Sequence, residues 1–291
     1  MEYIIVLIQA VIQGLTEFLP VSSSGHLSVI QHFMDIDSLE EGLFTMIVLH
    51  LGTLLAVFIA FRKAVWGMIR EFFLTIADIC TGKFSWRGMN GDRRMMFMVI
   101  AATALLFPAS LLSQFFSAPV GDRDIVFEGV AFVFTATLLF LADSCVKGVK
   151  ADKDITLKDA LTIGFFQVIA LFPGVSRSGS TISAGLFRGL SRKTAVTFSF
   201  MLSIPAVIGA TVFEGRAFLR DGGGVFDDVN WLAMGMGLLV SMIVGLFAIK
   251  LVKLLVKREK FKVFAIYVMT IGVLCIIWGA FEHITGITFR L

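Results

Sequence analysis

The sequence Pro20-Val21-Ser22-Ser23-Ser24-Gly25-His26 interrupts an apolar N-terminal region, and it has a near copy, Pro173-Gly174-Val175-Ser176-Arg177-Ser178-Gly179-Ser180, in the second half of the chain. Each copy contains small hydroxyl residues, glycine and one strongly functional side chain, His26 or Arg177. Irregular polar backbone is tolerated at membrane depth only where it is buried in protein or lines a wet cavity. Two such interruptions at matching places in two halves therefore indicate a binding site within a membrane.

The composition is that of a membrane protein. The 291 residues are 57% hydrophobic and only 16% charged, with a mean hydropathy of +0.89, whereas soluble domains are about half apolar and a quarter charged. A formal charge of +3 is too small to indicate binding to nucleic acid. Cys80, Cys145 and Cys275 lack metal-ligand spacing and predict free thiols. The N-terminus lacks the basic region of a signal peptide, so we expect it to stay on the mature protein.

Six apolar runs are long enough to cross about 30 Å of hydrocarbon, which takes roughly 20 residues. They lie near 43–62, 95–116, 125–146, 193–213, 231–256 and 262–281. Two further apolar regions, about 3–34 and 157–190, are broken at the two polar motifs, and each half of them is too short to cross alone. We expect each to be a re-entrant helix–loop–helix. The segment 64–92 has the pattern of an amphipathic helix on the cytoplasmic surface.

The distribution of Lys and Arg predicts the orientation. Basic residues concentrate after the first and third spans and between the fifth and sixth, whereas the alternate connections around 35–41, 122–124 and 214–228 are acidic or balanced. Because cytoplasmic loops carry the excess of Lys and Arg, both termini are expected outside. The first re-entrant pair then enters from the outer face, and the second enters from the cytoplasmic face.

The predicted fold is an all-α polytopic membrane protein, a single domain over 1–291, built as an inverted-topology repeat. Its halves, about 1–150 and 151–291, each contain one re-entrant helix–loop–helix and three transmembrane helices. In this arrangement the tips that carry His26 and Arg177 meet inside the membrane from opposite sides.

Gln13 and Glu17 lie four residues apart, so a helix places them on one face, together with Gln9. A carboxylate at membrane depth costs about 2.5–3.5 kcal/mol on insertion scales and therefore needs a partner or water. A polar seam between helices is the alternative explanation for these residues.

His26 is expected in the first turn of the second half-helix, where free backbone N–H groups and the positive end of the helix dipole favour an anion. Ser22, Ser23 and Ser24 add donors, and any of them is a candidate nucleophile if a base lies beside it. Helix capping and close packing of small residues explain one or two of these serines.

Arg177 is a permanent cation whose planar fork matches phosphate oxygens two at a time. The glycines and backbone N–H groups of the surrounding segment suit the close approach of an anion. The G-x-x-x-x-G spacing there lacks the lysine and the preceding strand of a nucleotide-binding loop, so nucleotide binding is not expected. A plain salt bridge between Glu17 and Arg177 is the alternative. A carboxylate, a histidine, hydroxyls and a guanidinium around an anion cradle suit phosphoryl transfer.

At these residues the chain resembles the undecaprenyl-diphosphatase family, also known for bacitracin resistance. The run from Gln13 to His26 matches the family's first signature and Pro173 to Gly179 its second, with agreement in length and span order over essentially the whole chain. The resemblance implies hydrolysis of undecaprenyl diphosphate to the monophosphate, which recycles the lipid carrier of cell-wall peptidoglycan synthesis in the bacterial plasma membrane. It also implies a divalent cation, Mg²⁺ or Ca²⁺, and a site that opens to the outer face.

By position, Glu17, His26, Ser23 and Arg177 correspond to family residues implicated in catalysis, and Glu17 is the candidate metal ligand. The expected substrate-binding residues are Gln13, Ser22, Ser24, Gly25, Ser176, Ser178, Gly179, Ser180 and Thr181. Gln13 stands where many members have glutamate, which leaves one acidic side chain. In the resulting hypothesis Arg177 and nearby N–H groups hold the diphosphate with the cation, Glu17 binds that ion or acts as base, and either His26 or Ser23 attacks the terminal phosphorus.

Other functions fit some of these features. A phosphatidic-acid-type lipid phosphatase shares the Ser-Gly-His and Ser-Arg pairs but has a second histidine, where this chain has Ser183. A polyprenyl-phosphate flippase or transporter shares inverted repeats and broken helices, with His50, Pro108 and Pro205 as gating or packing elements. The expected partners are polyprenyl diphosphate and membrane lipids, with no nucleic acid; a homodimer is left open.

Overall fold

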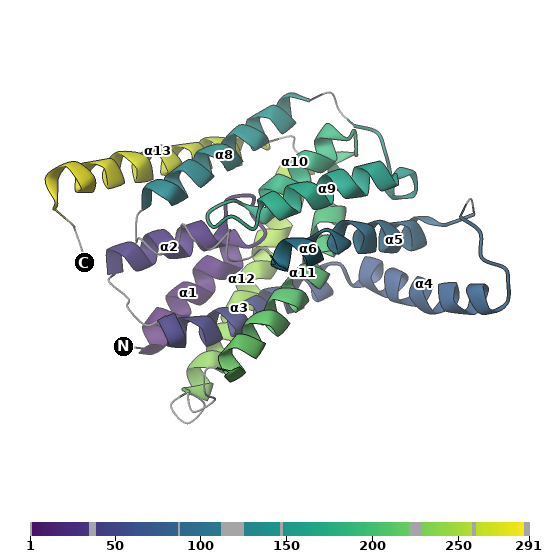
Figure 1. Cartoon of the computed structure of the whole chain (residues 1–291), viewed down its shortest axis with the longest axis horizontal. Helices are drawn as coiled ribbons and strands as arrows, with labels where there is room; N and C mark the ends of the chain where they lie inside the picture. The colour runs from purple at the N-terminus through teal and green to yellow at the C-terminus, as the bar shows by residue number, and fades with distance from the viewer. Residues whose placement is uncertain are drawn as a thin grey trace.

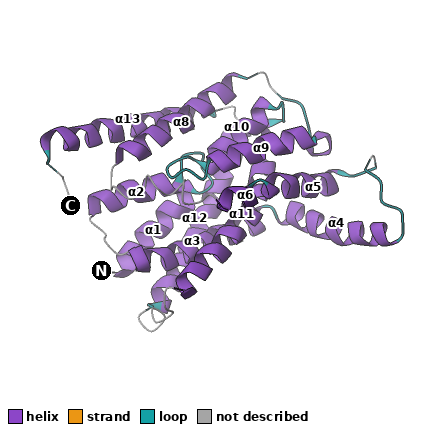
Figure 2. Ribbon diagram, viewed as in Figure 1, coloured by secondary structure: helices purple, strands orange, loops and turns teal. Residues whose placement is uncertain are grey.

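The computed structural model describes residues 2–34, 39–86, 88–111, 125–145, 148–220, 229–257 and 260–287. Within these ranges the regular structure is helical, with one isolated bridge between Lys150 and Leu190 (Figure 2). The helices are α1 (Glu2–Thr16), α2 (Ser23–Met34), α3 (Leu39–Ala60), α4 (Arg62–Cys80), α5 (Gly91–Ala104), α6 (Leu106–Leu111), α8 (Ile125–Ser144), the 3₁₀ turn η2 (Asp152–Asp154), α9 (Leu157–Ile169), α10 (Arg177–Phe187), α11 (Arg192–Arg220), α12 (Trp231–Lys257) and α13 (Lys262–Thr285).

Four of the six predicted spans are confirmed as single long apolar helices in the described part of the chain. They are α8, the Arg192–Phe213 part of α11, the Trp231–Val256 part of α12, and α13. A fifth candidate is the pair α3 and α4, which bends by 86° between Ala60 and Arg62. The protein is therefore an all-helical, multi-pass membrane protein.

The two remaining expected elements differ in detail from the prediction. The expected span at 95–116 is two helices, α5 and α6, with Leu105 between them, and residues 112–116 lie outside the described range. Fourteen residues of α5 rise only about 21 Å, which is less than the hydrocarbon thickness. The expected amphipathic helix is α4, which ends at Cys80 and presents Trp66, Phe72 and Phe73 on its exposed face.

Both interrupted regions are helix–loop–helix hairpins. We call α1–α2 the first hairpin and α9–α10 the second hairpin. The tip of each is the connecting loop with the first turn of the second helix, residues 17–26 in the first hairpin and 170–180 in the second. Each of these helices has 11 to 15 residues and rises at most about 23 Å, so none of them crosses a bilayer alone. In Figure 1 the start of α1 and the end of α13 lie on one side of the molecule, and the open end of the first hairpin faces that side. The open end of the second hairpin faces the opposite side (Figure 1).

The hairpins are packed by helices from both halves of the chain, and each has a large contact with the opposite half. α1 packs on α12 and on α3, whereas α9 packs on α5. α3 contacts both α12 and α11, and α8 runs beside α13 along one edge (Figure 1). As a result the two tips are enclosed in the interior of the bundle.

The open end of the second hairpin is closed by a buried carboxylate. Asp159, whose side chain is fully buried, accepts hydrogen bonds from Lys150 Nζ at 3.0 Å and from Arg188 Nε at 2.9 Å. It also forms a capping box with Thr156 at the start of α9. Because Arg188 is the C-terminal cap of α10, this cluster ties the two ends of the hairpin together.

Part of the predicted orientation depends on residues that the structure does not describe. These are the acidic stretches at 35–38, 122–124 and 221–228, together with Arg87, Lys147 and Arg258. The three cysteines are free, with Cys80 exposed and Cys275 buried.

Candidate active site

Glu17 lies at the centre of a polar cluster formed by both tips. It follows the last residue of α1, where its backbone N–H still donates to the carbonyl of Gln13 at 3.0 Å. Its Oε1 accepts a short hydrogen bond from Arg177 Nη2. Its Oε2 accepts from Gln13 Nε2 at 3.0 Å and from Ser23 Oγ at 2.9 Å. The expected meeting of the acid and the guanidinium is therefore present in the structure.

Arg177 approaches from the second hairpin as the first residue of α10. Its side chain is 18% exposed and that of Glu17 is 8% exposed, so the ion pair is largely removed from solvent. A second guanidinium nitrogen, Nη1, is buried and has no hydrogen-bond partner among the described residues. A buried guanidinium N–H without an acceptor is costly. This nitrogen is therefore available to an anion that enters the site.

The two tips also hold each other directly. Ser24 Oγ accepts a hydrogen bond from the backbone N–H of Gly174 at 3.3 Å. In the other direction, Ser178 Oγ donates to the carbonyl of Leu19 at 3.0 Å. Each hairpin thus uses a serine in the first turn of its second helix to bind the loop of the other.

The backbone brings the tips together through small residues. A Cβ atom on Gly25 would lie 2.7 Å from Phe132 Cζ and 3.2 Å from the Cα of Gly174. Gly174 has a φ of +79°, and Ser22 has a φ of +71° although it is not glycine. Such a conformation costs a non-glycine residue on the order of 1 kcal/mol and is typically found at functional sites.

A cavity of about 250 Å³ lies beside the ion pair. Six of the predicted site residues line it, and they come from both tips: Glu17, Ser22, Ser23, Ser24, Ser176 and Arg177. Apolar side chains from α6, α11 and the second tip complete the wall, including Leu106, Val207 and Leu171. The lining thus combines polar side chains with apolar ones.

The other predicted substrate-binding residues lie around this cavity and are not part of its lining. Gln13 lies behind Glu17, and its Oε1 is buried without a partner in the described part of the chain. Thr181 donates to the carbonyl of Arg177 and bonds Ser199. Gly179 donates its N–H to the cap Ser176, and Ser180 is fully buried. The role predicted for these residues, and for Ser178 and Gly25, stays a prediction.

His26 lies next to the cavity, and both of its ring nitrogens are occupied. Nδ1 is 2.7 Å from the carbonyl oxygen of Ser22, and Nε2 is 2.9 Å from the hydroxyl of Tyr267. The ring stacks on Tyr267 at a centroid distance of 5.7 Å and meets Phe132 edge-on. Because a carbonyl can only accept, Nδ1 carries the proton and Nε2 accepts from Tyr267. The imidazole is thus fixed in one tautomer on the α13 side of the tip.

Three polar residues of the site were not predicted as site residues. His50 of α3 lines the cavity with its Nε2 3.9 Å from Glu17 Oε2, and Gln167 of α9 lines it from the second hairpin. Thr135 of α8 accepts the N–H of Ser176 at 3.1 Å. In the sequence, each of these residues is noticeable only as a polar residue within an apolar helix. That pattern does not reveal which neighbouring helix the side chain faces.

The chain alone offers few ligands for a metal. No group of three or more His, Cys, Asp or Glu side chains that could hold an ion is present among the described residues. The oxygens available near the cavity include the Glu17 carboxylate, the unpartnered Oε1 atoms of Gln13 and Gln167, and the hydroxyls of the first tip. This hard-oxygen set suits Mg²⁺ or Ca²⁺ when phosphate oxygens complete the shell.

Comparison with known proteins agrees with this geometry. Residues 6–274, which include both tips, match the family model described as bacitracin resistance protein BacA. The chain is 40% identical over 271 residues to an undecaprenyl-diphosphatase of Alkaliphilus metalliredigens, covering 92% of this chain and 96% of the relative. It is 37% identical to an undecaprenyl-diphosphatase of Methanobrevibacter smithii, covering 98% and 100%, and 37% identical to undecaprenyl-diphosphatase 3 of Bacillus cereus, covering 94% and 96%. The chain therefore belongs to the BacA family.

Proposed function

We propose that this protein hydrolyses undecaprenyl diphosphate to undecaprenyl phosphate and inorganic phosphate. The observation that carries this proposal is the Glu17–Arg177 pair, which both hairpin tips bring to a cavity within a membrane protein. The relatives are named for this activity, so the flippase alternative is not favoured. In a bacterium, the reaction would recycle the lipid carrier for peptidoglycan synthesis and confer resistance to bacitracin.

Arg177 is the proposed clamp for the diphosphate. Its Nη1 has no partner among the described residues but is buried, so a phosphate oxygen can accept from it once the side chains around the ion pair shift. A bound diphosphate also competes with Glu17 for Nη2, because guanidinium binds phosphate in a bidentate manner. When the diphosphate replaces Glu17 as the partner of Arg177, the Glu17 carboxylate is free to accept a proton. Substrate binding would thus activate the base.

Ser23 is the proposed nucleophile. It lines the cavity and already donates its hydroxyl proton to Glu17 Oε2 at 2.9 Å. In the proposed step Ser23 Oγ attacks the terminal phosphorus and its proton moves to Glu17, while the bond to the bridging oxygen breaks and undecaprenyl phosphate leaves. Glu17 passes this proton to the departing undecaprenyl phosphate and becomes a carboxylate again. It then accepts a proton from the water that attacks the phosphoserine, and that proton returns to Ser23 Oγ as inorganic phosphate leaves.

His26, the other candidate nucleophile, has a different position. The Nε2 lone pair, which would have to attack phosphorus, accepts a hydrogen bond from Tyr267. The imidazole ring also does not line the cavity. We propose that His26 instead fixes the first tip, since its Nδ1–H holds the carbonyl of Ser22. Ser22 is the cap of α2 and is adjacent to Ser23.

A divalent cation is part of the proposal. The Oε1 of Gln13 would hold it together with phosphate oxygens of the substrate, because Glu17 acts as the base in this mechanism and not as the ligand. When bound, the ion would neutralise charge that develops on the leaving phosphate.

We further propose the inverted repeat of six spans and two re-entrant hairpins, with both termini outside the plasma membrane. It is supported by the exchanged packing, in which α1 packs on α12 of the other half and α9 on α5. It is also supported by the opposite directions of the two hairpins (Figure 1). The cavity-lining residues of α11, at 206–210, lie in the second half of its apolar segment Arg192–Phe213, away from the basic start, which favours an opening to the outer face.

The test is release of inorganic phosphate by the purified full-length chain. Polyprenyl diphosphate in detergent should give phosphate and polyprenyl monophosphate, and a chelator should abolish the reaction. A phosphatidic-acid-type phosphatase would instead release phosphate from phosphatidic acid. A pure flippase would release none from any lipid, which would refute the proposal.

The orientation has its own test. The exposed Cys80 at the end of α4 should react with a membrane-impermeant maleimide only after the cells are permeabilised. Labelling of Cys80 in intact cells would place Cys80 outside and contradict the proposed orientation.

A further inference from the structure

A second, larger cavity lies away from the proposed active site, at the junction of α3 and α4. Its volume is about 1080 Å³, and residues from α3, α4, α11, α12 and the segment around Gly148–Asp152 line it. Five of the lining side chains are basic: Arg62, Lys63, Arg192, Lys193 and Lys253. A single acidic side chain, Asp152, accompanies them in the lining.

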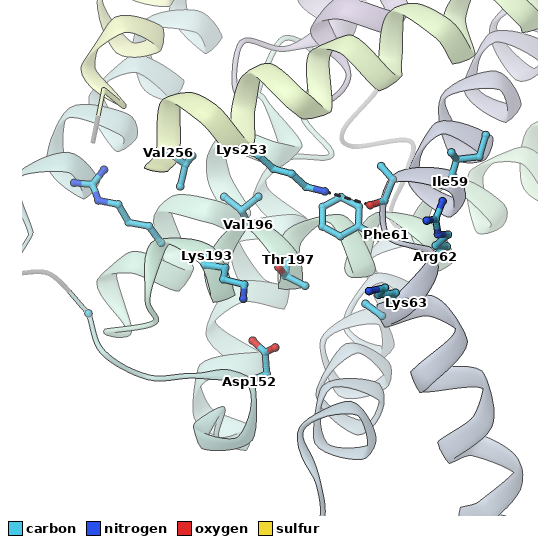
Figure 3. Close-up of a pocket in the computed structure, with 14 residues that line it drawn as sticks. Ile59, Phe61, Arg62, Lys63, Asp152, Lys193, Val196, Thr197, Lys253 and Val256 are labelled. Carbon is cyan, nitrogen blue, oxygen red and sulfur yellow. Dashed lines mark hydrogen bonds between the residues drawn. The ribbon is translucent and has the colours of Figure 1, made fainter. Parts of the chain in front are cut away.

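The basic side chains approach the cavity from several directions. Figure 3 shows Arg62 and Lys63 together at the α3–α4 junction, Lys253 above them, and Lys193 on the other side, opposite Asp152. Arg192 is paired with Asp143 at 3.0 Å. In contrast, Arg62, Lys63 and Lys193 form no ion pair with any residue of the described ranges. The cavity therefore holds a net positive charge, because its five cations outnumber Asp152 and, among the described residues, only Arg192 is in an ion pair.

The wall between these cations is apolar. Ile59, Ala60 and Ala64 line one side and Val196 and Val256 another. Lys253 lies over the ring of Phe61, with Nζ 3.7 Å from the ring centroid, and donates to the carbonyl of Ala60 at 3.2 Å (Figure 3). Cations above an apolar wall match a phosphate headgroup whose hydrocarbon chain remains in lipid.

This cavity is separate from the one at the hairpin tips. Both cavities are lined by α3 and α11, but at different heights: His50 against Ile59 on α3, and Ala206 against Thr197 on α11. Nine residues of helix separate each pair, which is ~13 Å of rise.

A line of packed aromatic rings also connects the neighbourhoods of the two cavities. Phe18, beside Glu17, contacts Phe200 with ring centroids 5.6 Å apart, and Phe200 contacts Phe61 at 5.2 Å. All three rings are buried. Dense protein thus lies along this line, and the basic cavity is not an extension of the catalytic one.

We propose that the basic cavity binds the phosphate headgroup of an anionic membrane lipid from the face opposite the catalytic opening. The binding is a function beyond diphosphate hydrolysis. It requires the charges of Arg62, Lys63 and Lys193, which are free to contact a ligand, and it leaves Glu17, Ser23 and Arg177 untouched.

Lipid binding is measured by native mass spectrometry of the full-length chain in detergent. The added probes are phosphatidic acid, phosphatidylcholine and inorganic phosphate, each alone. The wild type should retain phosphatidic acid in preference to phosphatidylcholine, and inorganic phosphate should not displace it. Equal retention of the two lipids, or displacement by inorganic phosphate at comparable concentration, would overturn the proposal.

The variant Arg62→Gln/Lys63→Gln/Lys193→Gln removes three charges from the cavity. Its affinity for phosphatidic acid should fall on the order of 10²-fold, because each cation contributes separately to binding an anionic headgroup. The matched control, Arg70→Gln/Lys83→Gln/Lys158→Gln, removes three exposed charges that do not line the cavity. It should change the affinity by no more than about threefold. Equal losses in both variants would show that only general charge attraction is at work.

A crosslinking measurement on the wild-type chain tests the proposal even if the triple variant does not fold. Phosphatidic acid with a photoreactive group near its phosphate should crosslink to peptides that contain residues 59–64 or 192–197. Crosslinks confined to other peptides would overturn the assignment. Phosphate release from polyprenyl diphosphate should be unchanged in the folded triple variant, so failure of this proposal is distinguishable from failure of the proposed catalytic function.

Discussion

The two hairpin tips share one backbone design and carry different chemistry. In the first tip Ser22 Oγ accepts the N–H of Gly25 and contacts Ser24 Oγ at 3.4 Å. In the second tip Ser176 Oγ accepts the N–H of Gly179, and its distance to the hydroxyl of Ser178 is 3.3 Å. The residue after the cap, however, is Ser23 in one tip and Arg177 in the other.

The difference shows how a duplicated frame can form a site that neither copy has alone. One tip supplies the carboxylate and the hydroxyl, and the other supplies the cation. Either charge alone would be buried without compensation, which is strongly unfavourable at membrane depth. The site therefore depends on both hairpins being in place.

The hairpins also differ in how they are anchored. The second is closed at its open end by Asp159. The first is held along α2 by neighbouring helices: Ser28 donates to Glu128 of α8 at 2.7 Å, and His32 lies 3.1 Å from Glu282 of α13. The second hairpin is thus stabilised internally, whereas the first depends on its neighbours.

The largest effect is expected for Ser23→Ala in the first tip. Loss of the nucleophile should lower kcat/KM for phosphate release on the order of 10⁴-fold or more, as removal of nucleophiles does elsewhere. The matched control is Ser183→Ala, which removes a buried hydroxyl of α10 that has no partner among the described residues. Ser183→Ala should stay within a few-fold of wild type, and mass spectrometry should detect a phosphoserine only when Ser23 is present. Full activity in Ser23→Ala would show that Ser23 is not the nucleophile.

Arg177→Lys tests the second tip with its charge retained. A lysine cannot bind two phosphate oxygens as a fork, so kcat/KM should fall about 10²-fold. Arg188→Lys, at the open end of the same hairpin, keeps a cation beside Asp159 and should leave the rate nearly unchanged. If Arg177→Lys retained wild-type kinetics, the guanidinium fork would have no special role.

Asp159→Asn tests the different anchoring of the hairpins through stability. Removing a buried charge between two cations typically costs 3–5 kcal/mol. We expect about 2–3 kcal/mol here, because the side chains of Lys150 and Arg188 are 33% and 37% exposed and regain solvent. Thermal unfolding in detergent should show a lower midpoint for Asp159→Asn than for Asp154→Asn in the same segment. Equal unfolding midpoints for the two variants would show that Asp159 does not anchor the second hairpin.

Tyr267→Phe should have the smallest effect. The change removes one hydrogen bond to His26 and keeps the stacked ring. A neutral hydrogen bond contributes about 0.5–1.5 kcal/mol, so the rate should fall at most about tenfold. Because Nε2 loses its donor, the pH profile of kcat/KM should also change if His26 orders the first tip. An unaltered rate and pH profile would show that the hydrogen bond from Tyr267 to His26 does not contribute to catalysis.

Much of this arrangement follows from patterns in the sequence. Apolar length predicts α8, α11, α12 and α13 because a bilayer fixes how many residues a span needs. The meeting of Glu17 and Arg177 follows from matching motifs in two halves, since each isolated charge requires a partner at that depth.

Other contacts depend on tertiary packing that no local pattern encodes. His50 lies in an apolar span, and nothing in its neighbours indicates that α3 turns it toward Glu17. The contact of His26 with Tyr267 joins residues 241 positions apart. The basic cavity arises because the chain bends by 86° after α3, which brings Arg62 and Lys63 close to the start of α11.

The most direct test of a shared site is a double-mutant cycle between the tips. Glu17→Gln, Arg177→Ala and the double variant are compared by kcat/KM for phosphate release, after size-exclusion chromatography shows that each is folded. If the acid and the guanidinium act on one bound diphosphate, the double variant should be about as active as the weaker single variant. Losses that simply multiply would mean that the two tips act independently, and would contradict the account.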